Sequence, residues 1–339
     1  MALAAETIVD LVTTTQHELG ENKWTDIASD IQEHYALPQF LKKERIKFQS
    51  GDQIQWNIRV SSNHAAKHTG MYGTDTTNVG DVMKTALIPW RHTTTNYAFE
   101  RREVAMNATP RRIVELVKVR RADAMIDLAD LLEETFWGKP VDSSDEETPY
   151  GLPYWIVKNT VEGFNGGAPS GFASGAGGLS SVTYANWRNW TAQYVAATKA
   201  DLVTKMRKAY TKIQFKTPVP IPDYAVGEDR YVIYTNYTGL SSLEDLGEAQ
   251  NENLGRDIAS MDGAIMFRKR PVQWVPYLDA DTTDPFYFVN WSVFHCVFLA
   301  GEYMVEEPPR QVSNQHTVFR VDIDLTHNTL ARNRRALAV

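Results

Sequence analysis

The sequence has 339 residues, of which 43% are hydrophobic, and its formal net charge is −7. This composition supplies enough apolar surface for a folded core and excludes a disordered chain. The negative charge argues against a protein that coats nucleic acid through its overall charge. The single cysteine, Cys296, excludes an intrachain disulfide and lies in an apolar run, where it is expected to be a buried small residue. No apolar run reaches the ~18 residues of a transmembrane helix.

Residues 1–43 are predicted to form an N-terminal arm. The arm contains short helical stretches, one of them over residues 24–35, and too little apolar surface to fold alone. It lacks the charged and apolar regions of a signal peptide. Residues 44–104 are predicted to form a long two-stranded hairpin.

The first strand of this hairpin is recognised by its alternation of apolar and polar residues. Ile54, Trp56 and Ile58 are separated by polar residues, as in a half-buried strand. The polar, glycine-containing stretch 61–81 predicts a mobile tip, and a returning strand is expected from about residue 85 to residue 103. Because two strands are marginally stable alone in water, we expect another subunit to cover this hairpin.

The clearest single element is a long helix predicted from Thr109 to Gly138. Thr109 suits the N-cap and Pro110 the first helical position. Gly138 suits the left-handed residue after the last turn, and Pro140 prevents continuation. The helix is about 40 Å long. Its apolar residues recur at helical spacing: Ile113, Leu116, Val117, Ala124, Leu128, Leu131, Leu132 and Phe136. Such a narrow stripe between polar flanks is typical of a helix that spans a flat molecule or lies at an interface.

The remaining chain alternates loops, helices and strands. The glycine-rich segment 163–178 is predicted to be a flexible surface loop. A helix is expected over 199–213, and a capping box at 241–244 is expected to open another. The last third is predicted to be rich in strands, at 231–234, 265–275, 287–299 and 318–325. In the last of these, Phe319, Val321, Ile323 and Leu325 alternate with Arg320, Asp322 and Asp324.

No constellation predicts catalysis. His64 and His68 are four residues apart, but the glutamate of a metalloprotease helix is missing, so a solvated loop is expected. The glycine-rich segment has neither phosphate-binding pattern. The acids Asp322 and Asp324 share a strand face and are expected to be solvated. We therefore predict no enzyme activity, no cofactor and no metal.

Aromatic and basic residues instead predict contacts between subunits, because arginine and large aromatic side chains favour interfaces. Contact with nucleic acid is an equally open interpretation of the arginines, including the basic tail Arg332, Arg334 and Arg335. Trp187 and Trp190 are expected to share a helix, as core or interface anchors or as a sugar-binding platform. The candidate subunit-interface residues are Ile54, Trp56, Ile58, Trp90, Arg91, Arg101, Arg102, Arg111 and Arg112.

The order of these elements resembles the major capsid proteins of tailed bacteriophages, the Hong Kong-97-type fold that encapsulin shells share. The most specific stretches are Asp262-Gly263-Ala264-Ile265, Arg270-Pro271-Val272, residues 284–289 and residues 320–324. The resemblance implies an α+β fold with an N-arm, an extended E-loop hairpin, a long spine helix, a peripheral (P) domain and an axial (A) domain. The implied segments are 1–43 (N-arm), 44–104 (E-loop), 105–149 (P domain with the spine helix), 150–270 (A domain) and 271–339 (β-rich return completing the P domain).

The resemblance also implies a function. The chain is expected to be a virion structural protein that assembles, in the host cytoplasm, into an icosahedral head shell of pentamers and hexamers around double-stranded DNA. Scaffolding, portal and decoration proteins are implied partners, and no membrane is involved. An encapsulin-like compartment shell is one alternative. A carbohydrate-binding or glycoside-processing protein is a second, motivated by the tryptophans and acids. No lysine–asparagine crosslink is predicted, although Lys67, Asn328 and Asn333 are present.

Overall fold

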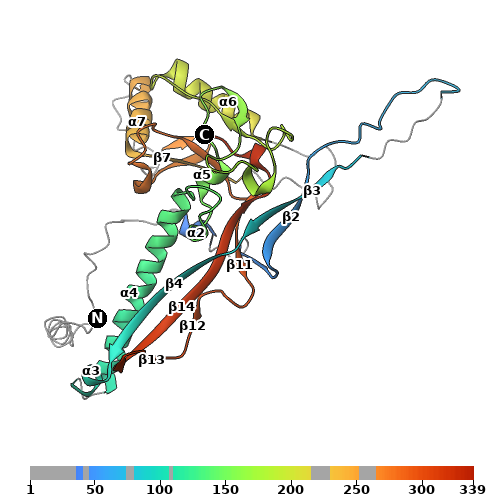
Figure 1. Cartoon of the computed structure of the whole chain (residues 1–339). Coiled ribbons are helices and arrows are strands. Elements are labelled where there is room, and N and C mark those ends of the chain that lie inside the picture. The colour runs from blue at the N-terminus through green and yellow to red at the C-terminus, as the bar shows by residue number, and fades with distance from the viewer. Residues whose placement is uncertain (1–35, 41–45, 74–79, 107–109, 215–229, 252–264) are drawn as a thin grey trace.

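The computed structural model describes residues 36–40, 46–73, 80–106, 110–214, 230–251 and 265–339. Figure 1 shows a body with two sheets, a long helix along one of them, and a hairpin that projects far from the body. Most of the predicted arm, including its helix at 24–35, lies outside the described residues. The part of the arm that is described forms helix α2 (Leu37–Phe40).

The larger sheet is built around one long strand, β14 (Gln315–Ala331). It pairs antiparallel with β4 (Arg91–Glu100) over ten residue pairs, from Val318 opposite Glu100 to His327 opposite Arg91. The other members of the sheet are β1 (Lys47–Gln49), β11 (Phe294–Leu299), β12 (Val305–Glu306) and β13 (Arg310–Val312). Strand β1 is parallel to β11, and all the other pairings in this sheet are antiparallel.

The alternation predicted for β14 is confirmed on one face only. Val321, Ile323 and Leu325 are buried as expected, because they face the long helix. Asp322 was expected to be solvated but is 3% exposed. Its carboxylate is instead paired with the guanidinium groups of Arg310 and Arg320.

The predicted long helix is confirmed as α4 (Pro110–Trp137), whose 28 residues span about 42 Å. Ala124, Leu128, Leu132 and Phe136 are spaced four apart and all buried, so they form the row that packs on the sheet. Leu131 was expected in this stripe but is 43% exposed, since it lies on the neighbouring flank.

Helix α4 is closed at its C-terminal end by a tightened turn. Thr109, the predicted cap, lies outside the described residues. Gly138 follows the helix as predicted, but it does not adopt a left-handed conformation. Its N–H instead donates to the carbonyl of Thr135 at 3.2 Å, so the helix closes with a tightened turn. Helix α3 (Arg101–Met106) precedes α4 at the far end of the sheet.

The smaller sheet has the order β10-β7-β9-β8. Two predicted strands are wrong as continuous elements. Residues 265–275 fold into a tight hairpin, and residues 287–299 divide between the two sheets because the chain turns at 291–293. The members of the smaller sheet are β7 (Tyr231–Thr235), β8 (Met266–Phe267), β9 (Arg270–Trp274) and β10 (Tyr287–Asn290).

Helices cover this sheet. The predicted helix at 199–213 is confirmed as a π-turn, η2 (Lys199–Val203), followed by α6 (Thr204–Lys212). Helix α7 (Tyr237–Asn251) begins before the predicted capping box at 241–244. The cap is Asn236, whose side-chain oxygen accepts the N–H of Gly239 at 2.9 Å. A short 3-10 turn, η4 (Pro276–Leu278), follows β9.

The glycine-rich segment 163–178 is packed into the body, which corrects the prediction of a flexible surface loop. It begins with β5 (Gly163–Gly166), which pairs with β6 (Asn189–Thr191), and ends in η1 (Ala176–Gly178). Gly175 has φ +86°, and a Cβ there would lie 2.1 Å from the carbonyl oxygen of Leu179. The glycines therefore allow close backbone packing rather than mobility.

Trp187 and Trp190 do not share a helix. Trp190 lies in β6, Trp187 lies in the preceding turn, and both are buried. Helix α5 (Leu152–Trp155) contributes Trp155 to the same core as Trp187, whereas Trp190 belongs to the core of the smaller sheet.

The C-terminus joins the two parts of the body. Turn η5 (Arg334–Ala336) leads into a short extended segment in which Leu337 belongs to the core of the larger sheet and Ala338 to that of the smaller. Arg334, predicted to contact a neighbour or nucleic acid, is fully buried. Burial lowers its pKa to about 10. Its guanidinium donates to the carbonyls of Trp155 (2.8 Å) and Trp187 (3.0 Å), so it is a core residue.

Candidate assembly interface

The projecting hairpin consists of β2 (Gln53–Arg59) and β3 (Met83–Pro89), paired antiparallel with Ile54 opposite Ile88. The returning strand expected at 85–103 is two strands, β3 and β4. Pro89 ends the first, since it has no N–H to donate, and β4 then turns away to pair with β14. Between the two strands, the described residues 60–73 and 80–82 continue outward as extended chain (Figure 1).

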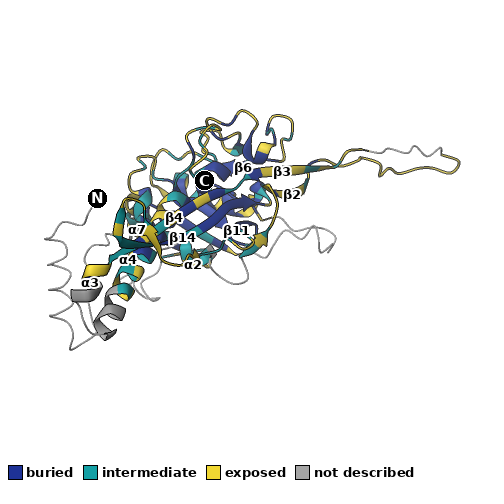
Figure 2. Cartoon of the chain, turned by 60° about the horizontal axis from the view of Figure 1, so that its bottom comes forward, coloured by how far each residue is buried: buried dark blue, intermediate teal, exposed yellow. Residues whose placement is uncertain are grey.

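The root of the hairpin is held by its own subunit. Ile54 is 0% exposed in the core of the larger sheet, so its side chain is covered before any neighbour binds. Trp56 packs edge-on against Trp155, with ring centroids 5.9 Å apart. Ile58, one pair further out, is half-buried. Val60, the next residue on this face, is 8% exposed, so the subunit itself covers the face as far as Val60. Residues 61–73 beyond it are exposed, as Figure 2 shows in yellow.

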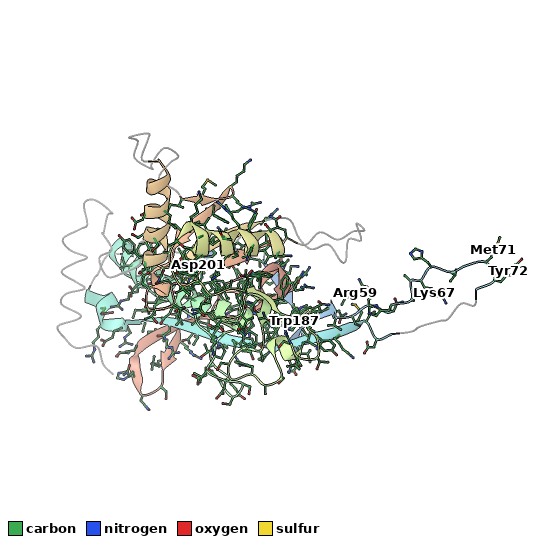
Figure 3. All side chains as sticks on the ribbon, turned by 90° about the horizontal axis from the view of Figure 1, so that it is seen from above. Arg59, Lys67, Met71, Tyr72, Trp187 and Asp201 are labelled. Atoms are coloured by element: carbon green, nitrogen blue, oxygen red, sulfur yellow. The ribbon has the colours of Figure 1, made fainter. Side chains whose placement is uncertain are left out.

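The tip exposes large apolar side chains. Met71 is 94% exposed and Tyr72 fully exposed, and Figure 3 shows both at the far end of the projection, beyond Lys67. On the outer face of the strands, Met83 and Leu87 are 37% and 44% exposed. A projection that ends in a fully exposed methionine and tyrosine is typical of a segment that is covered by a partner.

The predicted arginines do not form one patch. Arg91 is buried, and its guanidinium donates to the carbonyls of Asp145 (2.6 Å) and Thr148 (3.2 Å) within the same chain. Arg101 and Arg102 are exposed on α3. The side chains of Arg111 and Arg112 lie outside the described residues, although their backbone is in α4.

Trp90, at the junction of β3 and β4, is half-buried, and its indole N–H donates to the carbonyl of Gly51 at 2.8 Å. It therefore fixes the turn before β2 within the subunit. Of the nine candidates, Ile54 and Arg91 are buried by their own chain, while Trp56, Ile58 and Trp90 each retain exposed surface for a neighbour.

Sequence reasoning missed Glu133, a buried carboxylate on α4 that is 1% exposed. It accepts the backbone N–H groups of Ala36 (2.9 Å) and Leu37 (2.8 Å) and the indole N–H of Trp137 (2.8 Å). Glu133 thus fastens the end of the N-terminal arm to α4. The available signal was an acid next to Leu132 in the apolar stripe, one turn before Trp137.

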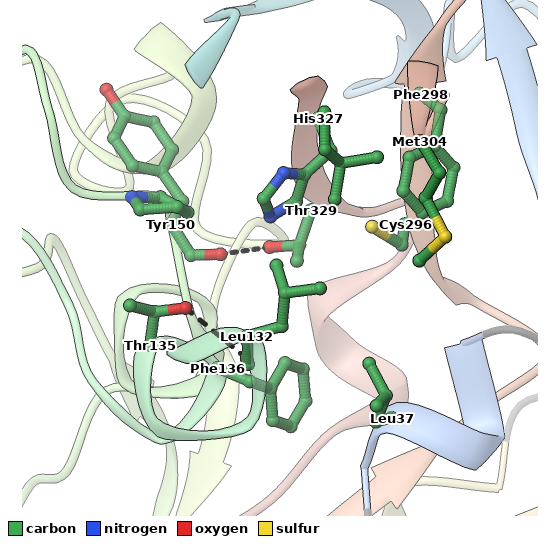
Figure 4. Close-up of a pocket in the computed structure, with 12 residues that line it drawn as sticks. Leu37, Leu132, Thr135, Phe136, Tyr150, Cys296, Phe298, Met304, His327 and Thr329 are labelled. Carbon is green, nitrogen blue, oxygen red and sulfur yellow. Dashed lines mark hydrogen bonds between the residues drawn. The ribbon is translucent and has the colours of Figure 1, made fainter. Parts of the chain in front are cut away.

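Two cavities in the described part of the chain have the concave form of a chemical site. The first, of about 20 Å³, lies between α4 and the larger sheet (Figure 4). It is lined by Cys296 and His327, among mainly apolar residues. Burial raises the pKa of the Cys296 thiol and lowers the pKa of His327 to about 4, so at neutral pH the thiol is protonated and the imidazole neutral. This confirms Cys296 as a buried small residue, and the cavity has room for about one water molecule.

The second cavity is an open groove of about 510 Å³ between α6 and the loop 282–286. Its described lining contains a single side-chain carboxylate, that of Asp284, which accepts a hydrogen bond from Asn236 at 2.6 Å. A glycosidase needs a pair of carboxylates, so this lining does not fit one. Trp187 and Trp190, the residues that motivated a sugar platform, are in the core.

Within the described ranges, His, Cys, Asp and Glu side chains nowhere gather in groups of three that could hold a metal ion. The pair predicted from sequence, His64 and His68, is exposed on the extended chain of the hairpin. None of the helices in the described part of the chain has the length and apolar character needed to cross a bilayer.

The architecture is similar to that of solved structures, although the sequence matches no family model. No protein-family model and no curated protein matches the sequence. Solved structures do match: the capsid asymmetric unit of cyanophage A-1(L) is 16% identical, with a TM-score of 0.61 over 96% of this chain and 98% of that chain. The capsid of a native GTA particle is 12% identical, with a TM-score of 0.57 over 96% and 97%. A chain from Mycobacterium phage Bobi is 9% identical, with a TM-score of 0.52 over 94% of each.

The fold is that of phage capsid subunits. The predicted fold class, the Hong Kong-97-type α+β capsid fold, is therefore confirmed. The match covers almost the whole of both chains, so the capsid fold includes the projecting hairpin, the long helix and both sheets.

Proposed function

We propose that this protein is a major capsid protein that assembles with copies of itself into an icosahedral head shell enclosing a phage genome. The observation that carries the proposal is a capsid fold whose hairpin projects away from the body and ends in exposed Met71 and Tyr72. A monomer gains nothing from such a projection, because apolar side chains at its end remain in water.

The segments take their roles from this fold. Residues 44–104 are proposed as the E-loop, with its root on β2 and β3. Residues 105–149 and 271–339 form the P domain around α4 and the larger sheet. Residues 150–270 form most of the A domain, and 1–43 the N-arm, anchored at its end by Glu133.

The proposed mechanism of assembly is physical. Each subunit lays its hairpin on a neighbour, and the contact buries the half-covered face of Trp56 and Ile58 together with the tip. Each contact is modest, but closed symmetry multiplies it over the whole shell. The proposed partners are further copies of the chain in pentamers and hexamers, with scaffolding, portal and decoration proteins and packaged double-stranded DNA. The proposed location is the virion, after assembly in the host cytoplasm.

The test compares assembly with folding. Met71→Ser with Tyr72→Ser removes apolar surface that the folded subunit does not bury, so the free energy of unfolding should stay within about 0.5 kcal/mol of the wild type. Negative-stain electron microscopy and size-exclusion chromatography should show loss of closed particles. Val161→Ser with Val182→Ser is the matched control, since it removes two other exposed apolar side chains from the body.

Trp56→Ala should also impair assembly more than folding, although it additionally removes the contact with Trp155. Normal particles from the Met71/Tyr72 variant would contradict the proposed role of the tip. Particles that hold a folded cargo protein and no DNA would identify an encapsulin-like shell instead.

A further inference from the structure

A dense basic patch lies on the A-domain side of the molecule, at the end remote from α3 (Figure 1). It is formed by the C-terminal half of α6 and by the turn between β8 and β9. Its members are Arg207, Lys208, Lys212, Arg268, Lys269 and Arg270. In a chain of net charge −7, six cations on two neighbouring elements are a local feature that overall composition does not predict.

Hydrogen bonds and ring contacts hold the two elements of the basic patch together. The Arg268 guanidinium donates to the Thr211 hydroxyl at 3.1 Å and lies 5.7 Å from the centre of the Tyr210 ring. Arg270 donates from Nε to the Tyr210 hydroxyl at 3.3 Å. Thr211 lies one turn after Arg207 and beside Lys212, so Arg268 joins the exposed basic face of α6.

The basic patch has few counter-charges. Lys208 is paired with Glu162 at 3.1 Å. Among the described residues, no carboxylate lies within ion-pair distance of Arg207, Lys212, Arg268 or Lys269. Like charges on neighbouring elements repel one another, so the basic patch does not by itself stabilise the described part of the subunit.

The turn that carries Arg268 and Lys269 is strained. Both residues adopt left-handed backbone conformations, with φ +49° and +64°. Two-residue hairpin turns of this kind strongly favour Asn-Gly or Gly-Gly, because a Cβ is unfavourable there. Two long cationic side chains thus occupy positions where the backbone favours small residues. Strain of this kind at a surface points to a function of the side chains.

We propose that the basic patch binds the phosphate backbone of double-stranded DNA without sequence preference. Guanidinium and ammonium groups are the groups that pair with phosphate oxygens. The contact of Arg268 with the Tyr210 ring and its hydrogen bond to Thr211 hold its guanidinium in place before binding, so less side-chain freedom is lost on contact. An acidic protein surface is the other anionic partner, but protein interfaces are built around buried aromatic and apolar anchors. The basic patch presents cations, with Tyr210 buried beneath them.

This inference deepens the proposed function, since it gives a shell protein a surface for the enclosed genome. The test uses the unassembled full chain and a short random-sequence DNA duplex, with binding followed by fluorescence anisotropy between about 50 and 200 mM salt. The four cations that are not paired with a described carboxylate predict a slope of log K against log salt of about −3 to −4. Arg268→Glu with Lys269→Glu should reduce the slope to about −2 and weaken binding at low salt by at least about tenfold.

Two further variants make the result decisive. Arg59→Glu with Lys118→Glu changes net charge equally at exposed positions on the hairpin and on α4, away from the basic patch, and should weaken binding much less. Arg268→Asn with Lys269→Gly removes the charges and relieves the strained turn, so it should melt at a higher temperature than the wild type and still bind DNA less tightly.

Equal weakening by the patch and control variants would overturn the proposal, since binding would then follow net charge alone. Patch variants that bind DNA like the wild type but no longer form particles would also overturn the proposal. The basic patch would then be a contact for an acidic protein surface. The wild type could form no particles while DNA binding is lost only in the patch variants. That result would support DNA binding by the basic patch and would count against the proposed assembly into a shell.

Discussion

The buried imidazole of His327 should make the subunit sensitive to acid. It lies between α4 and the larger sheet with 4% exposure, stacked near Phe298 (Figure 4), and none of the described residues hydrogen-bonds to its Nδ1. The residues that line the cavity from α2, α4, β11 and β14 are uncharged, with Tyr150 and Cys296 the only other titratable groups among those described. Arg91 lies opposite on β4, and its guanidinium donates to the carbonyls of Asp145 and Thr148. Burial in these apolar surroundings opposes protonation of His327.

The magnitude follows from the pKa. Burial lowers the pKa of His327 from 6.5 to about 4. Each pKa unit is worth about 1.4 kcal/mol, so protonation of the folded subunit costs about 3 kcal/mol more than protonation of the unfolded chain. Because the unfolded chain binds the proton more readily, the contribution is fully present above about pH 6.5. It falls by about 1.4 kcal/mol per pH unit until the pH reaches about 4.

His327→Phe keeps a ring in the core and removes the titration. We expect urea unfolding of the unassembled full chain to show a shallower loss of stability for this variant between about pH 6.5 and 4. Near neutral pH the variant should match or exceed the wild type, since an unpaired buried nitrogen is removed. His68→Phe is the control, because it replaces an exposed imidazole on the hairpin and leaves the buried imidazole of His327 in place. Parallel curves for His327→Phe and the wild type would refute the reasoning.

Three substitutions test the contacts that hold the subunit together. Glu133→Gln replaces a carboxylate that accepts three N–H groups with an amide that has one acceptor, and should lower the free energy of unfolding by about 1–3 kcal/mol. Arg334→Met leaves several buried carbonyls without a donor, and should cost at least about 3 kcal/mol. Gly175→Ala places a Cβ 2.1 Å from a backbone oxygen at positive φ, and should cost about 2 kcal/mol or more.

Each of these variants has a matched control measured by the same urea titration. Glu134→Gln and Arg332→Met alter exposed neighbours of the same type and should stay within about 0.5 kcal/mol of the wild type. Gly177→Ala also has positive φ, but its nearest contact would be 3.4 Å, so it should be milder than Gly175→Ala. A control that destabilises as much as its partner would show that the named contact is not the cause.

Sequence patterns within a few residues determined the helices and strands that depend on contacts between near neighbours along the chain. The span of α4 followed from Pro110 and from the spacing of Leu128, Leu132 and Phe136, because a helix is defined by contacts within a few residues. The alternation of Ile54, Trp56 and Ile58 likewise indicated β2, and the order of elements indicated the capsid fold.

Tertiary structure decided where those elements go and which charges are buried. The sequence around Pro89 does not say that β4 leaves the hairpin to pair with β14, more than two hundred residues away. Arg334 is indistinguishable in sequence from its neighbour Arg332, yet its acceptors come from segments far along the chain. Glu133 and His327 are likewise buried by distant segments. Short-range periodicity specifies helices and strands, whereas pairing, burial and pKa depend on residues that only folding brings together.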